Sequence, residues 1–250
     1  MISQGIAEAV VVAAGSSRRM GGRDKLGLTI GDRPILRWSV EAMAAAPEIA
    51  GIIVVTAPER VEALQATPWL TELDARVVAG GRRRQDSTAL GVRAATADIV
   101  LVHDAARPLV SPALVSRVVA GVQEHGAAIP ALPVVDALKH VDGERITGSA
   151  ERSGLYRAQT PQGARRELLL AATEAHAHSD DDIPDEADLL ARHGVPVSIV
   201  PGESGNIKVT EPDDLALARR LAEERVGLRV AHGSDSHPFG PEMGLRLGGL

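Results

Sequence analysis

The stretch Ala9–Lys25 combines small and basic residues in a way that favours binding of an anion. It begins with the apolar run Val10–Ala13, which is typical of a buried parallel strand. The glycine and serine residues that follow let the backbone approach a ligand, and its free N–H groups can then hold an anion. Arg18, Arg19 and Lys25 add fixed positive charge that suits a phosphate-rich ligand. Neither the G-x-G-x-x-G nor the Walker pattern is present. The alternative is an ordinary strand-to-helix turn with solvated arginines, since basic turns are common.

Further polar clusters stand where other strands are expected to end. Gly80–Ser87 joins a glycine pair to three arginines, and Ser87 either caps the following helix or bonds a base or phosphate. Asp104 emerges from an apolar strand, where a carboxylate needs a cation, a metal or hydrogen-bond donors. Mg²⁺ is a natural partner beside phosphates, and the alternative is an ion pair with Arg107 alone. Lys208 lies on a short extended segment, where a lone lysine is usually a surface charge.

The composition excludes several kinds of function. A length of 250 residues permits one large α/β domain or two small ones, and 44% apolar residues suffice for a core. The absence of cysteine excludes thiolate catalysis, disulfides and cysteine-based zinc sites, and it fits a cytoplasmic protein. A net charge of −6 argues against non-specific nucleic-acid binding, and no apolar run is long enough for a membrane span.

The chain alternates apolar runs with segments of helical periodicity, which predicts a doubly wound, mostly parallel α/β sheet. Strands are expected at Val10–Ala13, Gly51–Ala57, Ala75–Ala79, Asp98–Asp104, Ala127–Val134 and Val195–Val200. Helices are expected at Pro34–Ala46, from Glu59, and at 87–95, 111–124, 163–176, 184–193 and 212–225. Ligands of such sheets bind at the carboxyl ends of the strands, where the polar clusters stand.

Residues 137–152 interrupt this alternation. Asp142 and Gly143 stand between two short β-prone runs, a pattern typical of a hairpin. Such an insertion is either an arm for a partner subunit or a solvated hairpin.

Together the clusters resemble, in order and spacing, the 2-C-methyl-D-erythritol 4-phosphate cytidylyltransferase family of the non-mevalonate isoprenoid pathway. The matching motifs are AAGSSRRMG at Ala13–Gly21, Lys25, GGRRRQDS at Gly80–Ser87, VHDAARP at Val102–Pro108, D-x-x-K at Asp136–Lys139, RSGLYRAQTPQ at Arg152–Gln162 and NIKVTEPDDL at Asn206–Leu215. The resemblance covers about residues 8–226. It implies one Rossmann-like nucleotidyltransferase domain at 1–226 with a protruding arm at about 137–152.

The resemblance implies transfer of CMP from CTP to methylerythritol 4-phosphate, with Mg²⁺ and release of diphosphate. No covalent enzyme intermediate is needed, so positioning and charge neutralisation carry the rate. By the match, the catalytic residues are Arg19, Lys25 and Lys208. Asp104 holds Mg²⁺, and the CTP site comprises Ala13, Ala14, Gly15, Gly81, Ser87, Asp104 and Ala105. Methylerythritol phosphate is assigned to Arg107, Asp136, Arg152 and Thr160, with the arm reaching a partner in a homodimer.

Three positions depart from the family pattern. Asp24 replaces a common proline, Arg82 replaces an acidic residue, and Ala137 replaces a threonine that commonly contacts the substrate. The related ribitol 5-phosphate cytidylyltransferases share much of the pattern and are the first alternative. A nucleotide-binding scaffold without turnover is the second, and the retained basic residues and Asp104 argue against it.

Residues 227–250 resemble the opening strand of methylerythritol cyclodiphosphate synthase. This includes an Asp-x-His pair, Asp235 and His237, whose side chains on a strand share one face and can share a metal. Two ligands alone rarely form a zinc site. We therefore expect this tail to be the truncated start of a fused cyclase, poorly ordered and inactive.

Overall fold

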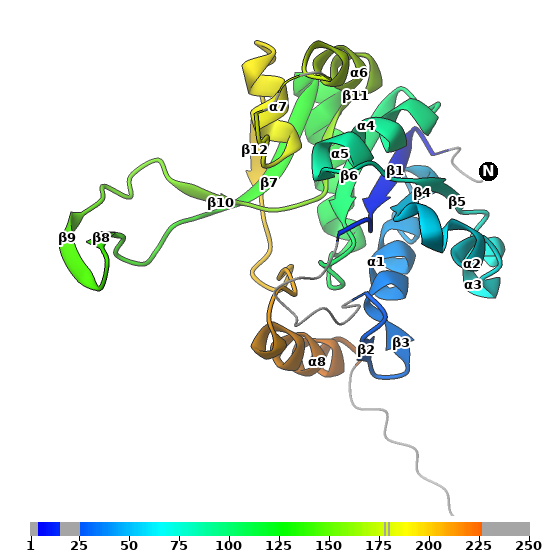
Figure 1. The fold of residues 1–250 in the computed structure, drawn as a ribbon, viewed down its shortest axis with the longest axis horizontal. Coiled ribbons are helices and arrows are strands. Elements are labelled where there is room, and N and C mark those ends of the chain that lie inside the picture. The colour runs from blue at the N-terminus through cyan, green and yellow to red at the C-terminus, as the bar shows by residue number, and fades with distance from the viewer. Residues whose placement is uncertain (1–4, 16–25, 178, 180, 227–250) are drawn as a thin grey trace, which may run out of the picture.

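A central eight-stranded sheet organises the computed structural model, which describes residues 5–15, 26–177, 179 and 181–226 (Figure 1). From one edge, its strands are β5 (Arg76–Ala79), β4 (Ile49–Thr56), β1 (Ala7–Val12), β6 (Ile99–Asp104), β11 (Gln162–Arg165), β7 (Ala127–Pro133) and β10 (Tyr156–Ala158), with β12 (Ser198–Pro201) also paired to β7. The pairs β5–β4, β4–β1, β1–β6 and β7–β12 are parallel. The prediction of a mostly parallel α/β sheet is therefore confirmed.

Strand β11 is the main departure from the predicted topology. It runs antiparallel between β6 and β7, so the helix expected from Gly163 begins only at Arg166. At Gly163 a Cβ atom would lie 2.4 Å from Leu101 Cδ2 and 2.8 Å from Val122 Cγ2. Close packing against β6 and helix α5 (Pro112–His125) thus uses a residue without a side chain, and pairing with two neighbouring strands sets the local structure.

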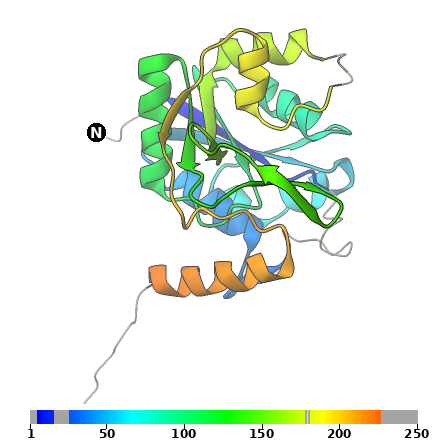
Figure 2. The same cartoon turned by 90° about the vertical axis from the view of Figure 1, so that its left-hand side faces the viewer.

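Helices cover both faces of the sheet (Figures 1 and 2). The helices of the described residues are α1 (Ile35–Ala44), α2 (Val61–Gln65), α3 (Pro68–Glu72), α4 (Arg84–Ala94), α5 (Pro112–His125), α6 (Arg166–Ala175), α7 (Glu186–Arg192) and α8 (Pro212–Val226), with a 3₁₀ turn at Pro58–Arg60. Of these, α8 lies beyond the sheet, beside residues Thr29–Ile30 (Figure 1). Val11 packs in a core with α1 and α5, whereas its neighbour Val10 packs in a second core with α4 and α6. This alternation is what a strand buried on both faces requires.

Two helix starts show how local chemistry sets the boundaries. Ser111 caps α5 as predicted, because its hydroxyl accepts the Leu114 N–H at 3.0 Å. The single helix expected from Glu59 is instead divided into a 3₁₀ turn, α2 and α3. The break at Thr67 precedes Pro68, which has no N–H to continue a helix.

The predicted hairpin at 137–152 is present, and we call these residues the arm. It consists of β8 (Lys139–Asp142) and β9 (Arg145–Ser149), joined by a turn in which Gly143 has a φ of 57°. The arm extends away from the sheet in Figure 1 and points toward the viewer in Figure 2. A second small hairpin, β2 (Thr29–Ile30) with β3 (Arg33–Pro34), precedes α1. None of the helices within the described part of the chain is long and apolar enough to cross a membrane.

Candidate active site

The loops that follow β1, β5 and β6 surround a cavity of about 380 Å³ at the carboxyl edge of the sheet. Parallel pairing brings these loops together, since Val12 pairs with Asp104 on one side and Val55 on the other. Seven residues predicted from the sequence line this cavity: Ala13, Ala14, Gly15, Gly81, Ser87, Asp104 and Lys208. The sequence clusters thus form one site.

The glycine pair after β5 packs tightly against the start of α4. A Cβ atom at Gly80 would lie 2.8 Å from Ala14 Cβ, and one at Gly81 would lie 2.4 Å from Asp86 Cβ. Ser87 Oγ accepts the Gly81 N–H at 3.1 Å and donates to the Arg83 carbonyl at 3.1 Å. Ser87 therefore fixes the loop from inside the helix. The suggestion that it caps the helix is wrong, because the cap position is Arg83.

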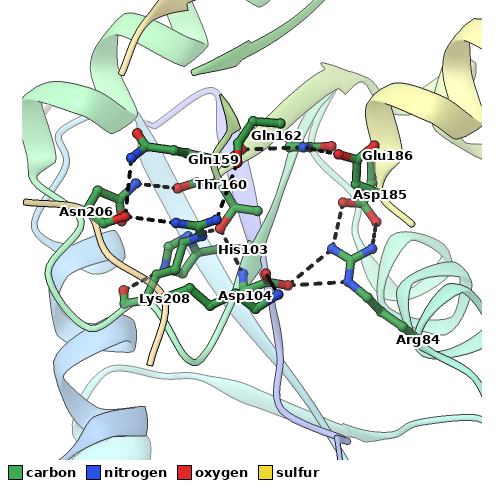
Figure 3. Close-up of polar contacts among 12 residues, drawn as sticks. Arg84, His103, Asp104, Gln159, Thr160, Gln162, Asp185, Glu186, Asn206 and Lys208 are labelled. Carbon is green, nitrogen blue, oxygen red and sulfur yellow. Dashed lines mark hydrogen bonds and ion pairs between the residues drawn. The ribbon is translucent and has the colours of Figure 1, made fainter. Parts of the chain in front are cut away.

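Asp104 lies at the floor of the cavity between two cations (Figure 3). Its Oδ1 accepts from Arg84 Nη2 at 3.2 Å, and its Oδ2 lies 2.7 Å from Lys208 Nζ. Burial alone raises the pKa of the Asp104 carboxyl, but the charges of Arg84 and Lys208 outweigh it and hold the pKa well below its usual range. The simple ion pair with Arg107 is not formed, because that guanidinium donates to the carbonyls of Asn206 and Ala158.

A hydrogen-bond chain beneath Asp104 fixes its backbone. The Asp104 N–H donates to Thr160 Oγ1 at 3.1 Å, and Thr160 Oγ1 lies 3.0 Å from His103 Nδ1. His103 Nε2 lies 3.1 Å from the Arg107 carbonyl, which can only accept, so Nε2 carries the proton and Nδ1 accepts from Thr160. Burial lowers the pKa of His103 to about 4, so the ring is neutral near pH 7.

The loop that carries Lys208 is held by the segment around β10 and β11. Asn206 is fully buried, and its Nδ2 donates to the Thr160 carbonyl at 2.8 Å. Gln159 exchanges two hydrogen bonds with the backbone of Glu203, at 2.7 and 3.0 Å. Arg107 Nη1 donates to the Asn206 carbonyl at 2.8 Å. Together these contacts place the Lys208 ammonium against Asp104 (Figure 3).

The profile of the 2-C-methyl-D-erythritol 4-phosphate cytidylyltransferase family, IspD, matches residues 7–224, a span that contains the whole cavity. The chain belongs to this family.

Individual relatives extend the likeness. The chain is 44% identical over 248 residues to the bifunctional enzyme IspD/IspF of Dinoroseobacter shibae, covering 97% of this chain and 60% of that protein. It is 38% identical to the 2-C-methyl-D-erythritol 4-phosphate cytidylyltransferase of Cereibacter sphaeroides, covering 88% and 98%. The crystal structure of the cytidylyltransferase from Thermus thermophilus superposes with a TM-score of 0.73 at 36% identity, covering 85% and 97%.

The bifunctional relatives bear on the tail. A match to 97% of this chain reaches into residues 227–250, which agrees with the resemblance of the tail to a cyclase. The chain spans 60% to 64% of the length of the bifunctional relatives from Dinoroseobacter shibae, Desulfotalea psychrophila and Rhodospirillum rubrum. The domain division at residue 226 and the inactivity of the tail stay predictions. Asp235 and His237 lie outside the described residues.

Other family residues are placed less directly. Arg19 and Lys25, predicted to be catalytic, and Asp24 also lie outside the described residues. Ala105 is buried, and its N–H donates to the Val12 carbonyl at 3.1 Å. Arg107 holds the loop that carries Lys208. Thr160 is 3% exposed, and its hydroxyl accepts the Asp104 N–H.

The remaining predicted substrate residues lie on or beside the arm. Asp136 and Arg152 are exposed at its base, and Arg152 donates to the Val135 carbonyl. Figure 1 shows the arm extending away from the loops that form the cavity. The substrate contacts of Arg107, Asp136, Arg152 and Thr160 stay predictions.

Sequence reasoning missed Arg84, Gln159, Glu186 and Asn206. Arg84 stands in a run of three arginines that gives no sign of which one turns inward. Glu186 pairs with it across 102 positions of the chain. Gln159 and Asn206 fall within the matched motifs. The sequence did not reveal that both side chains are buried and hold the loop that carries Lys208.

Proposed function

We propose that this chain transfers CMP from CTP to 2-C-methyl-D-erythritol 4-phosphate, giving 4-(cytidine 5'-diphospho)-2-C-methyl-D-erythritol and diphosphate. Family membership supports this reaction. The observation that supports it most directly is the cavity, in which an ionised Asp104 lies beside Lys208 and shares the lining with Gly81, in the loop after β5. The absence of cysteine favours the cytoplasm as its location.

The reaction joins two phosphorus-containing groups without an enzyme-bound intermediate. A phosphate oxygen of the sugar attacks the α-phosphorus of CTP, and the bond to the bridging oxygen breaks so that diphosphate leaves. Charge that develops on the phosphoryl oxygens needs fixed positive partners. Lys208 supplies one such charge from the cavity wall, and the loop at Ala13–Gly15 with Gly81 offers backbone N–H groups. Arg19 and Lys25 would supply the others.

Asp104 fits a role in holding Mg²⁺ with CTP. No group of three His, Cys, Asp or Glu side chains within the described ranges is arranged to hold a metal ion. A single ionised carboxylate together with phosphate oxygens and water is nevertheless the ligand set that Mg²⁺ commonly uses with nucleotides. When bound, the ion would offset the charge of the triphosphate. Lys208 would then exchange its contact with Asp104 for a phosphate oxygen.

The arm supports a homodimer in which each site is completed by the other subunit. Val141 and Ile146 on the arm are 58% and 67% exposed, which leaves apolar surface for a partner to cover. Arg152 at the base of the arm has an exposed guanidinium suited to a sugar phosphate. In the proposed dimer, Arg152 and Asp136 act at the partner's cavity.

The test is diphosphate release from CTP and Mg²⁺ with methylerythritol 4-phosphate or ribitol 5-phosphate as acceptor. Release with the first acceptor alone supports the proposal and shows that Ala137 is tolerated. Release with ribitol 5-phosphate alone shows that this compound is the acceptor and leaves the proposed CTP site unchanged. No release with either acceptor favours a scaffold that binds nucleotide without turnover.

A further inference from the structure

A single guanidinium, that of Arg84, is shared between the carboxylates of Asp104 and Glu186 (Figure 3). Its contacts with Glu186 are bidentate, with Nη1 2.8 Å from Oε1 and Nη2 3.0 Å from Oε2. Its contacts with Asp104 are longer, at 3.3 Å from Nε and 3.2 Å from Nη2, and both reach the same oxygen, Oδ1. The geometry therefore favours Glu186 as the principal partner of Arg84.

Glu186 is held firmly enough to act as an anchor. It is 2% exposed, and Thr88 on α4 donates to its Oε1 at 3.2 Å. Glu186 is the first residue of α7, whose cap Asp185 accepts from Gln162 Nε2 at 3.0 Å. The other end of the same amide, Gln162 Oε1, accepts the Ala187 N–H at 2.9 Å. Strand β11 and helix α4 thus fix Glu186 from two sides.

Both oxygens of Asp104 are engaged by cations, Oδ1 by Arg84 and Oδ2 by Lys208. A divalent cation at Asp104 competes with both contacts, and because Lys208 is proposed to move to a phosphate oxygen, Arg84 is the competitor that stays beside the carboxylate. An arginine that had Asp104 as its sole anionic partner would resist displacement, because a buried charge without a partner is costly. Arg84 avoids this cost, since it keeps two hydrogen bonds with Glu186 when it leaves Asp104.

We propose that Glu186 is a positioning residue, which holds the Arg84 guanidinium back from Asp104 and so leaves that carboxylate accessible to the divalent cation that accompanies CTP. The inference rests on the proposed function, because it concerns a metal held at Asp104. It assigns a role to α7, an element whose side chains do not line the cavity.

The first variant is Glu186→Gln, which keeps the shape of the side chain but removes its charge and replaces one of its two acceptor oxygens with a donor. CTP binding is measured by calorimetry over a Mg²⁺ titration, without sugar phosphate, so that turnover plays no part. We expect the Mg²⁺ concentration for half-maximal binding to rise about tenfold, with near-normal CTP affinity at saturating Mg²⁺. Asp188→Asn is the matched control, because it removes the same charge from α7 at an exposed pair with Arg192.

The double variant Arg84→Met with Glu186→Gln separates charge competition from structural damage. With the arginine removed, we expect the Mg²⁺ requirement to return to the wild-type value or fall below it. Thermal melting shows that each variant is folded.

An unchanged Mg²⁺ midpoint in Glu186→Gln overturns the inference, as does a double variant that needs as much Mg²⁺ as the single one. In both cases wild-type CTP binding leaves the proposed function standing. A wild-type protein that binds no CTP at any Mg²⁺ concentration overturns the proposed function and this inference together.

Discussion

Thr160 Oγ1 accepts the N–H of Asp104 at 3.1 Å across 56 positions of the chain, and it donates its own proton toward His103 Nδ1 at 3.0 Å. The residue that ends strand β6 is thereby fixed by the turn between β10 and β11. Two elements that run antiparallel to the main sheet direction therefore take part in shaping the site.

Thr160→Val tests this link. The valine side chain matches threonine in shape but leaves the Asp104 N–H and His103 Nδ1 without their buried partner. We expect the free energy of unfolding to fall by about 2 kcal/mol and CTP affinity to fall with it. Thr160→Ser keeps the hydroxyl and should retain most of both quantities. Equal stability and CTP binding in the valine variant and the wild type would show that the link is dispensable.

His103 gives stability a pH dependence of known sign. The folded protein keeps the ring neutral down to about pH 4, whereas the unfolded chain takes up the proton near pH 6.5. The unfolded state therefore binds more protons between these values, and stability falls as the pH drops through this window, by up to about 3 kcal/mol.

Urea unfolding at pH 7 and pH 4.5 measures this contribution, with His103→Asn as the variant that cannot ionise. We expect a smaller difference between the two pH values in the variant than in the wild type. Asp104 masks little of the effect, because its lowered pKa means that its own contribution is lost mostly below pH 3.8. Parallel pH dependence in both proteins would refute the neutral, buried assignment.

Lys208→Gln removes a charge that faces both Asp104 and the proposed position of the phosphates. We expect kcat/KM to fall roughly a hundredfold, because a fixed positive charge is lost where negative charge develops. Arg93→Gln, at an exposed position in the last turn of α4 and outside the cavity lining, is the matched control and should leave kcat/KM unchanged. Steady-state diphosphate release measures the effect. A loss of less than about threefold would remove Lys208 from the catalytic residues.

Deletion of residues 137–148 tests the arm. The ends of this segment are close, since the Ala150 N–H donates to the Leu138 carbonyl at 3.0 Å, so the cut need not disturb the sheet. We expect a monomer that still binds CTP but has lost binding of the sugar phosphate. Sedimentation and calorimetry measure the two properties. A shortened protein that remains dimeric and active would contradict the proposed dimer.

The sequence predicts most of the sheet because its strands and helices carry strong periodic signals. Val10–Ala13 and Ile99–Val102 are continuous apolar runs, and Ser111 with Pro112 marks a helix start unambiguously. Gln162–Arg165 has no such signal, because a short strand between two neighbours derives its stability from pairing with them.

The sequence predicts that the strand ends meet at one site. It does not predict which cations pair with Asp104 there. Arg107, three residues from Asp104, is the obvious partner in the sequence, yet the carboxylate pairs with Arg84 and Lys208. Those contacts depend on how distant loops are held by Gln159 and Asn206. Spacing along the chain carries no information about such geometry.

The placement of Lys208 late in the chain sets an order of events during synthesis. Ribosomes complete β1, β6 and the loop at Gly80–Gly81 long before the segment 206–208, which brings the lysine to Asp104. A nascent chain that ends before Asn206 can pair the central strands, but Arg84 alone faces its aspartate, and the buried anchor to Thr160 is missing. An interrupted translation product of this length therefore contains Asp104 without its Lys208 contact and without the Asn206 anchor.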